Sequence, residues 1–125
     1  MKLLFSLLAA LCLSLSVHAQ KIDYPYPVRY LQLQLEQQSV KMAYMDVPAE
    51  APNGRTVVLL HGKNFNGYYW KDLVATLNTF GYRVIVPDQV GWGLSDKPGI
   101  HYSFHLLAAN TKVLLDSLGI GRVQV

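Results

Sequence analysis

The segment Thr56–Leu60 constrains the fold of this chain more than any other stretch. It is apolar along its whole length, which predicts a strand that buries both of its faces. A strand of this kind belongs inside a sheet that is covered on both sides. We therefore expect an α/β fold, in which strands alternate with helices and form a parallel sheet.

The segments that follow fit this expectation. A helix is predicted over Tyr69–Phe80, because its apolar side chains recur at helical spacing, and Gly81 is placed to end it. An apolar strand over Tyr82–Val86 comes next. The buried face of the helix is expected to hold Trp70, Leu73, Val74, Leu77 and Phe80.

A second helix is predicted over Phe104–Leu118, with Ser103 as its N-terminal cap and Gly119 at its end. Arg122–Val125 then predicts the start of a further strand. The buried side of this helix is expected to hold Leu107, Thr111, Leu114, Leu115 and Leu118.

The N-terminal part of the chain predicts antiparallel structure instead. Two Tyr-Pro pairs indicate an extended arm over residues 20–28, because proline cannot donate to a strand ladder. Leucines alternate with polar residues over 31–35, which is typical of a half-buried strand, and a polar turn leads to a second strand over Val40–Val47. The two strands are expected to form a hairpin, and Pro48–Gly54 is a loop by composition. We expect one partial α/β domain over residues 29–125.

Composition restricts the class of protein. The chain has 125 residues, of which 51% are hydrophobic and 15% charged, so it is expected to fold as a single domain. Its net charge of +3 is small and its basic residues are scattered, which argues against a nucleic-acid partner. A single cysteine excludes a disulfide framework and a cysteine-based zinc site within this chain.

Residues 1–19 are predicted to be a secretory signal peptide that is cleaved after Ala19. A short basic start precedes the apolar run Leu3–Leu15, which is shorter than the roughly 20 residues that a membrane-spanning anchor needs. A lipoprotein signal at Cys12 is the third alternative, and the bulky Leu11 before it argues against lipidation. We therefore expect export to the periplasm or the medium, with no membrane segment after cleavage.

The first candidate site follows the buried strand directly. His61 and Gly62 come after Leu60, and a glycine-containing loop then leads to the first predicted helix. Ligands of open α/β sheets bind beyond the carboxyl ends of the strands, where free backbone N–H groups can stabilise an oxyanion. The alternative is that the His-Gly pair only terminates the strand. Tyr68 and Tyr69 are weaker candidates for the lining of a substrate pocket beside this loop.

The second candidate segment, Asp88–Ser95, follows the next strand. Gly91 and Gly93 allow close turns, and the Asp88 side chain can accept hydrogen bonds from backbone amides a few residues ahead. We interpret this segment as a structural loop, because neither Asp88 nor Ser95 has a visible base partner.

These two motifs, in this order, resemble the α/β-hydrolase superfamily, and the similarity covers residues 29–125. Esterase-like, epoxide-hydrolase-like and proline-iminopeptidase-like members are the most similar. By this resemblance the backbone amide of Lys63 is the first donor of an oxyanion hole, and His61 and Gly62 form its turn. Asp88–Ser95 resembles the loop after the family's fourth strand.

The resemblance also implies where the catalytic residues of the family lie. In the family the nucleophile, the acid and the catalytic His follow the fifth strand, which is expected to begin near Val123. The chain is therefore expected to be the N-terminal half of an exported hydrolase of ester, amide or related bonds, inactive by itself, with a small-molecule substrate when completed. The alternative is a non-catalytic interaction protein built on half of the fold, whose open strand pairs with a partner. Val90 and the Lys63-Asn64 pair differ from common subfamily patterns.

Other chemistry is weakly indicated. Gly91 and Gly93 suggest a dinucleotide loop, but the third glycine position is Asp96. His101 and His105 are spaced like paired ligands on a helix, but His101 precedes the expected cap. We expect no cofactor and no metal.

The exported chain is expected to begin at Gln20, because signal peptidase would cut after Ala19. N-terminal sequencing of the protein recovered from the periplasm or the medium measures this directly. Recovery of a chain that retains Met1, or of one with a lipid-modified Cys12, would contradict the prediction.

Overall fold

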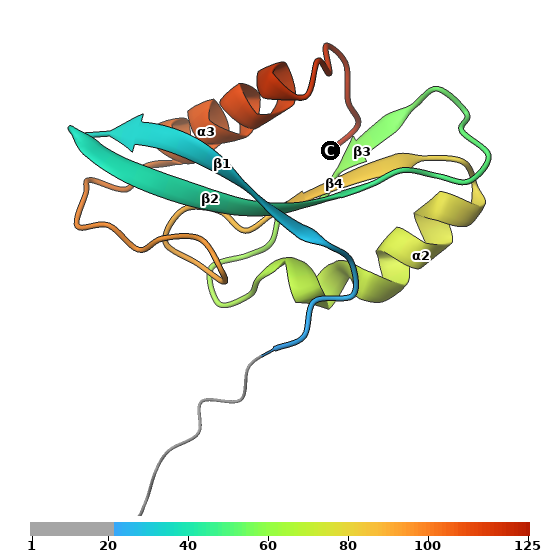
Figure 1. Ribbon diagram of the computed structural model, residues 1–125, viewed down its shortest axis with the longest axis horizontal. Helices are drawn as coiled ribbons and strands as arrows, with labels where there is room; N and C mark the ends of the chain where they lie inside the picture. The colour runs from blue at the N-terminus through green and yellow to red at the C-terminus, as the bar shows by residue number, and fades with distance from the viewer. Residues whose placement is uncertain (1–21) are drawn as a thin grey trace, which may run out of the picture.

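The computed structural model describes residues 22–125, and the signal peptide predicted over 1–19 lies outside them. Two antiparallel strands come first, and strands and helices then alternate, as predicted (Figure 1). In chain order the elements are β1 Val28–Leu35, β2 Gln38–Val47, β3 Thr56–Val58, the 3₁₀-helix η1 Gly67–Trp70, α2 Lys71–Thr79, β4 Arg83–Pro87 and α3 Phe104–Ser117.

The four strands form one mixed sheet in the order β1-β2-β4-β3. β1 and β2 make the predicted antiparallel hairpin, and β3 and β4 make the predicted parallel pair. β2 also pairs antiparallel with β4, so that Met45 lies opposite Val86. This last pairing places the hairpin and the parallel strands in one continuous sheet.

The two faces of the sheet hold separate hydrophobic cores. α3 covers one face and α2 covers the other (Figure 1). In β4, Ile85 faces the α3 core, whereas Val84 and Val86 face the α2 core. In β3, Val58 faces the α3 core and Val57 faces the α2 core. This alternation explains why both strands are apolar throughout, and it confirms the prediction of a sheet buried on two faces.

The first predicted helix is divided in two. Its N-terminal turn is η1, in which the Asn66 side chain accepts a hydrogen bond from the Tyr68 amide, and α2 begins only at Lys71. The expectation that Leu73 and Phe80 are buried was wrong, and Phe80 is 68% exposed. α2 contacts the sheet through a narrow stripe centred on Val74, and Phe80 stands beyond its last turn.

Two predicted strands are shorter in the structure. β3 ends at Val58 rather than at Leu60, although the Leu59 amide still donates to Ile85 O at 3.0 Å. The expected strand from Arg122 is a single parallel bridge between Val57 and Gln124. These residues therefore lie beside β3 on its side away from β4.

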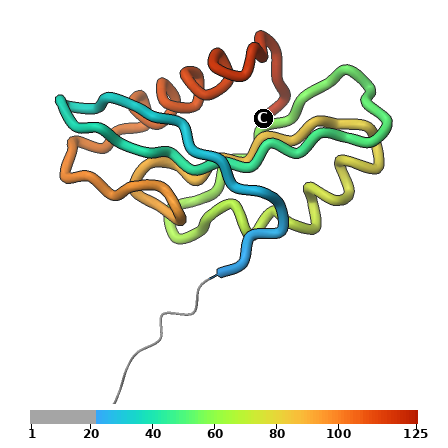
Figure 2. The backbone as a smooth tube through the Cα atoms, viewed as in Figure 1, coloured from blue at the N-terminus to red at the C-terminus, as the bar shows by residue number. Residues whose placement is uncertain are grey.

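The tip of the hairpin contacts the loop that leads to α3 (Figure 2). Glu36 and Gln37 form its turn with positive φ angles of 46° and 63°. The Glu36 carboxylate accepts a hydrogen bond from the His101 amide at 2.9 Å, and the Gln38 side chain donates to Gly99 O at 3.3 Å. The hairpin therefore holds the loop before α3 in place.

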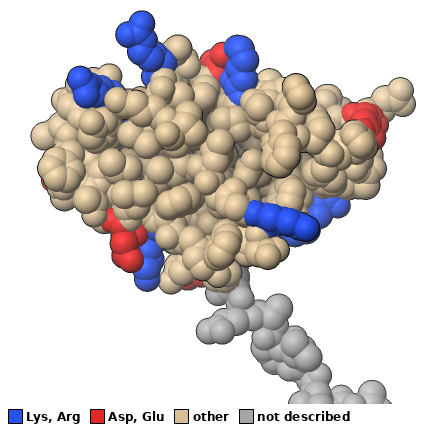
Figure 3. Space-filling view, turned by 180° about the vertical axis from the view of Figure 1, so that it is seen from behind, with Lys and Arg blue, Asp and Glu red and all other residues tan. Residues whose placement is uncertain are grey.

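Charged residues are dispersed over the face seen in Figure 3, with no basic patch. Between residues 22 and 125, no helix is long and apolar enough to cross a bilayer.

Substitution of Ile85 with alanine is expected to lower the free energy of unfolding by about 2–5 kcal/mol, because the side chain is fully buried in the α3 core. Phe80→Ala is the control, and it should change that free energy by less than about 1 kcal/mol. Urea denaturation of both variants measures the difference. Equal losses would show that the two side chains are not buried as described.

Candidate active site

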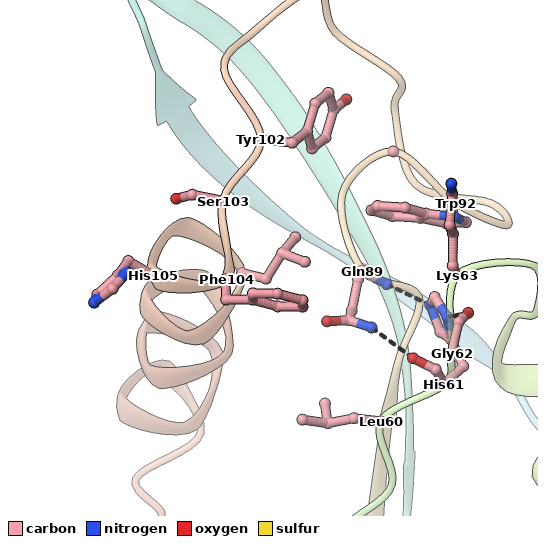
Figure 4. Close-up of a pocket in the computed structure, with 12 residues that line it drawn as sticks. Leu60, His61, Gly62, Lys63, Gln89, Trp92, Tyr102, Ser103, Phe104 and His105 are labelled. Atoms are coloured by element: carbon pink, nitrogen blue, oxygen red, sulfur yellow. Dashed lines mark hydrogen bonds between the residues drawn. The ribbon is translucent and has the colours of Figure 1, made fainter.

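His61 joins the loop after β3 to the loop after β4 (Figure 4). Its ring Nε2 accepts a hydrogen bond from the Gln89 backbone amide at 2.9 Å. The proton of the neutral ring is therefore on Nδ1, which donates to Gly62 O at 2.9 Å. The Gln89 side chain returns a hydrogen bond from Nε2 to His61 O at 2.9 Å. Both ring nitrogens have partners within the chain, so this histidine holds a loop rather than acting as a free base.

Lys63 is an exposed residue in the turn that His61 stabilises. The Phe65 amide closes this turn by donating to Gly62 O at 3.1 Å. Within residues 22–125, the Lys63 amide has no acceptor. The turn therefore presents an N–H donor without a partner among these residues, beyond the carboxyl end of β3, and its part in an oxyanion hole stays a prediction.

An open pocket of about 960 Å³ adjoins this turn. Its lining comes from the loops after β3 and β4 and from the start of α3, and it is largely apolar. Figure 4 shows the Phe104 ring turned toward Gln89, whereas the His105 ring points away from it. The lining residues are Leu60, His61, Gly62, Lys63, Gln89, Gly91, Trp92, Tyr102, Ser103, Phe104, His105 and Leu107.

Tyr68 and Tyr69 lie outside this lining. Tyr69 is exposed and packs edge-on against Phe65, and Tyr68 meets the ring of Tyr24. Gln89 was not predicted from the sequence to be a site residue. A signal was present, because Gln89 follows a buried strand at the same edge of the sheet as His61.

Asp88 is the most buried charged group next to the site, with 1% of its surface exposed. Its Oδ1 accepts from the Gly67 amide at 2.6 Å. Its Oδ2 accepts from the Tyr24 hydroxyl at 2.6 Å and from the Leu94 amide at 2.7 Å. No Lys or Arg within the described residues pairs with it. Three neutral donors therefore hold this buried carboxylate, as is expected of a buried charge without a counter-ion.

The loop after β4 is built around this carboxylate. The Ser95 hydroxyl donates to Asp88 O at 2.5 Å and accepts from the Ala43 amide at 2.8 Å. Gly93 has a φ of +53°, and a Cβ there would meet the Asp88 carboxylate. Gly91 has a φ of +100°, and its Cβ would come within 2.8 Å of the Tyr102 ring. The structure therefore brings Asp88, Gly91, Gly93 and Ser95 together as parts of one tight loop.

The Tyr24 hydroxyl is held in its protonated form. Burial, together with the hydrogen bond to Asp88 and the charge of that carboxylate, raises the pKa of Tyr24 well above its usual range. Tyr24 therefore remains a hydrogen-bond donor at all physiological pH values.

Comparison with known proteins identifies the family. The family described as "alpha/beta hydrolase fold" matches residues 55–125. The chain belongs to the α/β-hydrolase fold family. The mixed sheet with its flanking helices matches the N-terminal part of this fold.

Similar proteins carry several activities. A cis-3-alkyl-4-alkyloxetan-2-one decarboxylase of Xanthomonas campestris pv. campestris is 50% identical over 60 residues, which cover 47% of this chain and 19% of that protein. A haloalkane dehalogenase of Mycolicibacterium paratuberculosis is 37% identical over 78 residues, or 61% of this chain and 25% of that protein. The crystal structure of a probable hydrolytic enzyme from Pseudomonas aeruginosa PAO1 matches with a TM-score of 0.79 and 48% identity, over 82% of this chain and 33% of that one. The chain thus spans about a fifth to a third of these proteins.

In this α/β-hydrolase chain, the residues considered for a metal site or a dinucleotide loop do not form such a site among residues 22–125. The backbone of His101 donates to Glu36, before α3 begins, while His105 lies within α3. Residues 22–125 contain no group of three or more His, Cys, Asp or Glu side chains that could hold a metal ion. The segment around Gly91 and Gly93 continues as a loop to Ser103 and does not open a helix, so it lacks the geometry of a dinucleotide loop.

Three glycine variants separate the effect of backbone strain from that of a clash with the Asp88 carboxylate at Gly93. Gly93→Ala is expected to lower the free energy of unfolding by at least about 3 kcal/mol, because it adds a clash with a buried carboxylate to the strain of a positive φ. Gly119→Ala adds only the strain and should cost about 1–2 kcal/mol. Gly99→Ala adds neither and should stay within about 0.5 kcal/mol. Chemical denaturation measures all three, and a Gly93→Ala loss no larger than that of Gly119→Ala would refute the contact.

Proposed function

We propose that this chain forms the N-terminal part of an exported α/β hydrolase that cleaves an ester, amide or related bond of a small molecule. The observation that carries the proposal is the free Lys63 amide, which stands at the carboxyl edge of the sheet beside an apolar pocket. We assign this N–H to the oxyanion hole, as its first donor.

The chemistry needs a donor that is already in place. Attack on a carbonyl places negative charge on its oxygen, and a preorganised N–H stabilises that charge by about 2.7–4 kcal/mol in known cases. The hydrogen bonds between His61 and Gln89 fix the turn before any substrate arrives. The loop therefore does not have to reorganise when the charge develops.

The nucleophile and its base are proposed to stand in a longer polypeptide. Within residues 22–125, no serine hydroxyl is hydrogen-bonded to a histidine. Ser95 is committed to the Asp88 loop, and the Ser103 side chain caps α3. We infer that the 125-residue chain alone is inactive, and the short span of the match to relatives supports this.

The pocket supports a small and largely apolar substrate. Leu60, Trp92 and Phe104 contribute apolar surface, and no Asp or Glu lines the space. The similar proteins include a decarboxylase, a dehalogenase and a probable hydrolytic enzyme, so bond cleavage of the ester or amide type is our choice among several chemistries of this fold.

The test compares two substitutions at position 63, of which only one removes the backbone N–H that we propose as the donor. In the full polypeptide that carries this sequence, Lys63→Pro eliminates the backbone N–H, and Lys63→Ala removes only the side chain. Relative to Lys63→Ala, the proline variant is expected to lower kcat for an aryl ester by about 10²–10³-fold, with KM little changed. Equal kcat values for the two variants would remove the amide from the mechanism.

The intact mass of the native polypeptide distinguishes the two hypotheses, part of a longer hydrolase or a short interaction protein. A mass well above that of residues 20–125, with aryl-ester hydrolysis that a serine-directed inhibitor abolishes, supports the hydrolase. A native mass equal to residues 20–125 without hydrolysis contradicts it and favours the alternative, an interaction protein whose β3 side is completed by a partner strand.

A further inference from the structure

The N-terminal arm, residues 22–27, packs the partly buried side chains of Tyr24 and Tyr26 against the α2 core, and Tyr24 also reaches Asp88. The hydroxyl of Tyr24 donates to Asp88 Oδ2 at 2.6 Å, across 64 positions of sequence. Its ring meets the Tyr68 ring edge-on, with centroids 6.5 Å apart, and packs against the α2 core. The arm is therefore fastened to the interior and does not simply lie on the surface.

The contact reaches a carboxylate whose other bonds hold both loops of the pocket. The Gly67 amide, which bonds to Asp88 Oδ1, starts η1 directly after the turn that carries Lys63. The Leu94 amide, which bonds to Oδ2, follows Trp92 of the pocket lining. The orientation of the Asp88 carboxylate thus sets where these two loops stand relative to each other.

Tyr24 and Leu94 share one oxygen of this carboxylate. Loss of the hydroxyl would leave a buried charge with two donors in place of three, and no lysine or arginine of the described residues is paired with it. The carboxylate would then draw the Gly67 and Leu94 amides closer or rotate toward another donor. Either response moves the ends of the loops.

We propose that Tyr24 is a positioning residue for the hydrolytic site, which acts through Asp88 on the turn that presents the Lys63 amide. The N-terminal arm then belongs to the support of the active site. The kinetic consequence rests on the proposed function, whereas the structural consequence can be measured without an activity assay.

The matched variants are Tyr24→Phe and Tyr26→Phe. The first keeps the ring and removes the donor to Asp88. The second makes the same chemical change two residues away, at a half-buried tyrosine whose hydroxyl has no hydrogen bond to residues 22–125. In ¹H–¹⁵N spectra of the full polypeptide that carries this sequence, Tyr24→Phe is expected to move the Gly67, Leu94 and Lys63 amide signals, and Tyr26→Phe is expected to leave them in place.

The kinetic readout uses the full polypeptide and an aryl ester. Tyr24→Phe is expected to lower kcat per folded molecule by about 10–100-fold, with KM little changed, because a displaced donor stabilises the transition state less well. Tyr26→Phe should retain kcat. A Tyr24→Phe variant that loses stability but keeps both its kcat and its Lys63 amide signal would overturn the proposal.

Two other results would also decide whether Tyr24 positions the turn. If the wild-type polypeptide shows no hydrolysis, the proposed function fails, and the amide signals alone decide whether Tyr24 positions the turn. If Tyr24→Phe does not fold, 3-fluorotyrosine at position 24 provides a more acidic donor to Asp88. The Gly67 and Leu94 signals should then shift toward weaker hydrogen bonds, and unchanged signals would overturn the proposal.

Discussion

This part of the molecule depends on a buried carboxylate, that of Asp88, which has no counter-ion among residues 22–125. Asp88 keeps its charge away from water only because donors from three regions of the chain converge on it: Tyr24 of the arm, Gly67 after the β3 loop and Leu94 after β4. Removal of any donor would leave charge uncompensated at a high cost. The loops around the pocket are therefore fixed relative to each other by electrostatics as well as by packing.

The sheet determines the position of the hydrogen bonds that join the loops after β3 and β4. β3 and β4 run parallel, so their carboxyl ends lie at one edge, and His61 joins the two loops that leave this edge. The cores on both faces hold the strands rigidly and leave only the loops to carry polar groups outward. A free amide at Lys63 is thus a property of the whole arrangement, since neither loop alone would keep it fixed.

The sequence predicted the elements better than their contacts. A period of two located the hairpin, continuous apolar runs located the parallel pair, and a period of 3.6 residues located both helices. These patterns are local because burial determines which positions along an element are apolar. Local spacing carried no information on the pairing of β2 with β4, which joins residues far apart in the chain. The exposure of Phe80 was missed because helical periodicity marks a face without showing how far the sheet extends beneath it. For the site, the motif predicted the turn at His61, but the role of Tyr24 depends on a contact across 64 residues.

The hairpin tip shows how a remote turn can matter to a pocket. Glu36 and Gln38 bond to the backbone of the loop that runs into α3. That loop carries Tyr102 to the pocket wall and leads to Phe104, the first residue of α3, which also lines the pocket. Insertion or deletion of a residue at this turn would shift the carboxylate of Glu36 along the loop and change the entry of α3. Variation in hairpin length is therefore a route by which a protein of this architecture can reshape its binding space without altering a single lining residue.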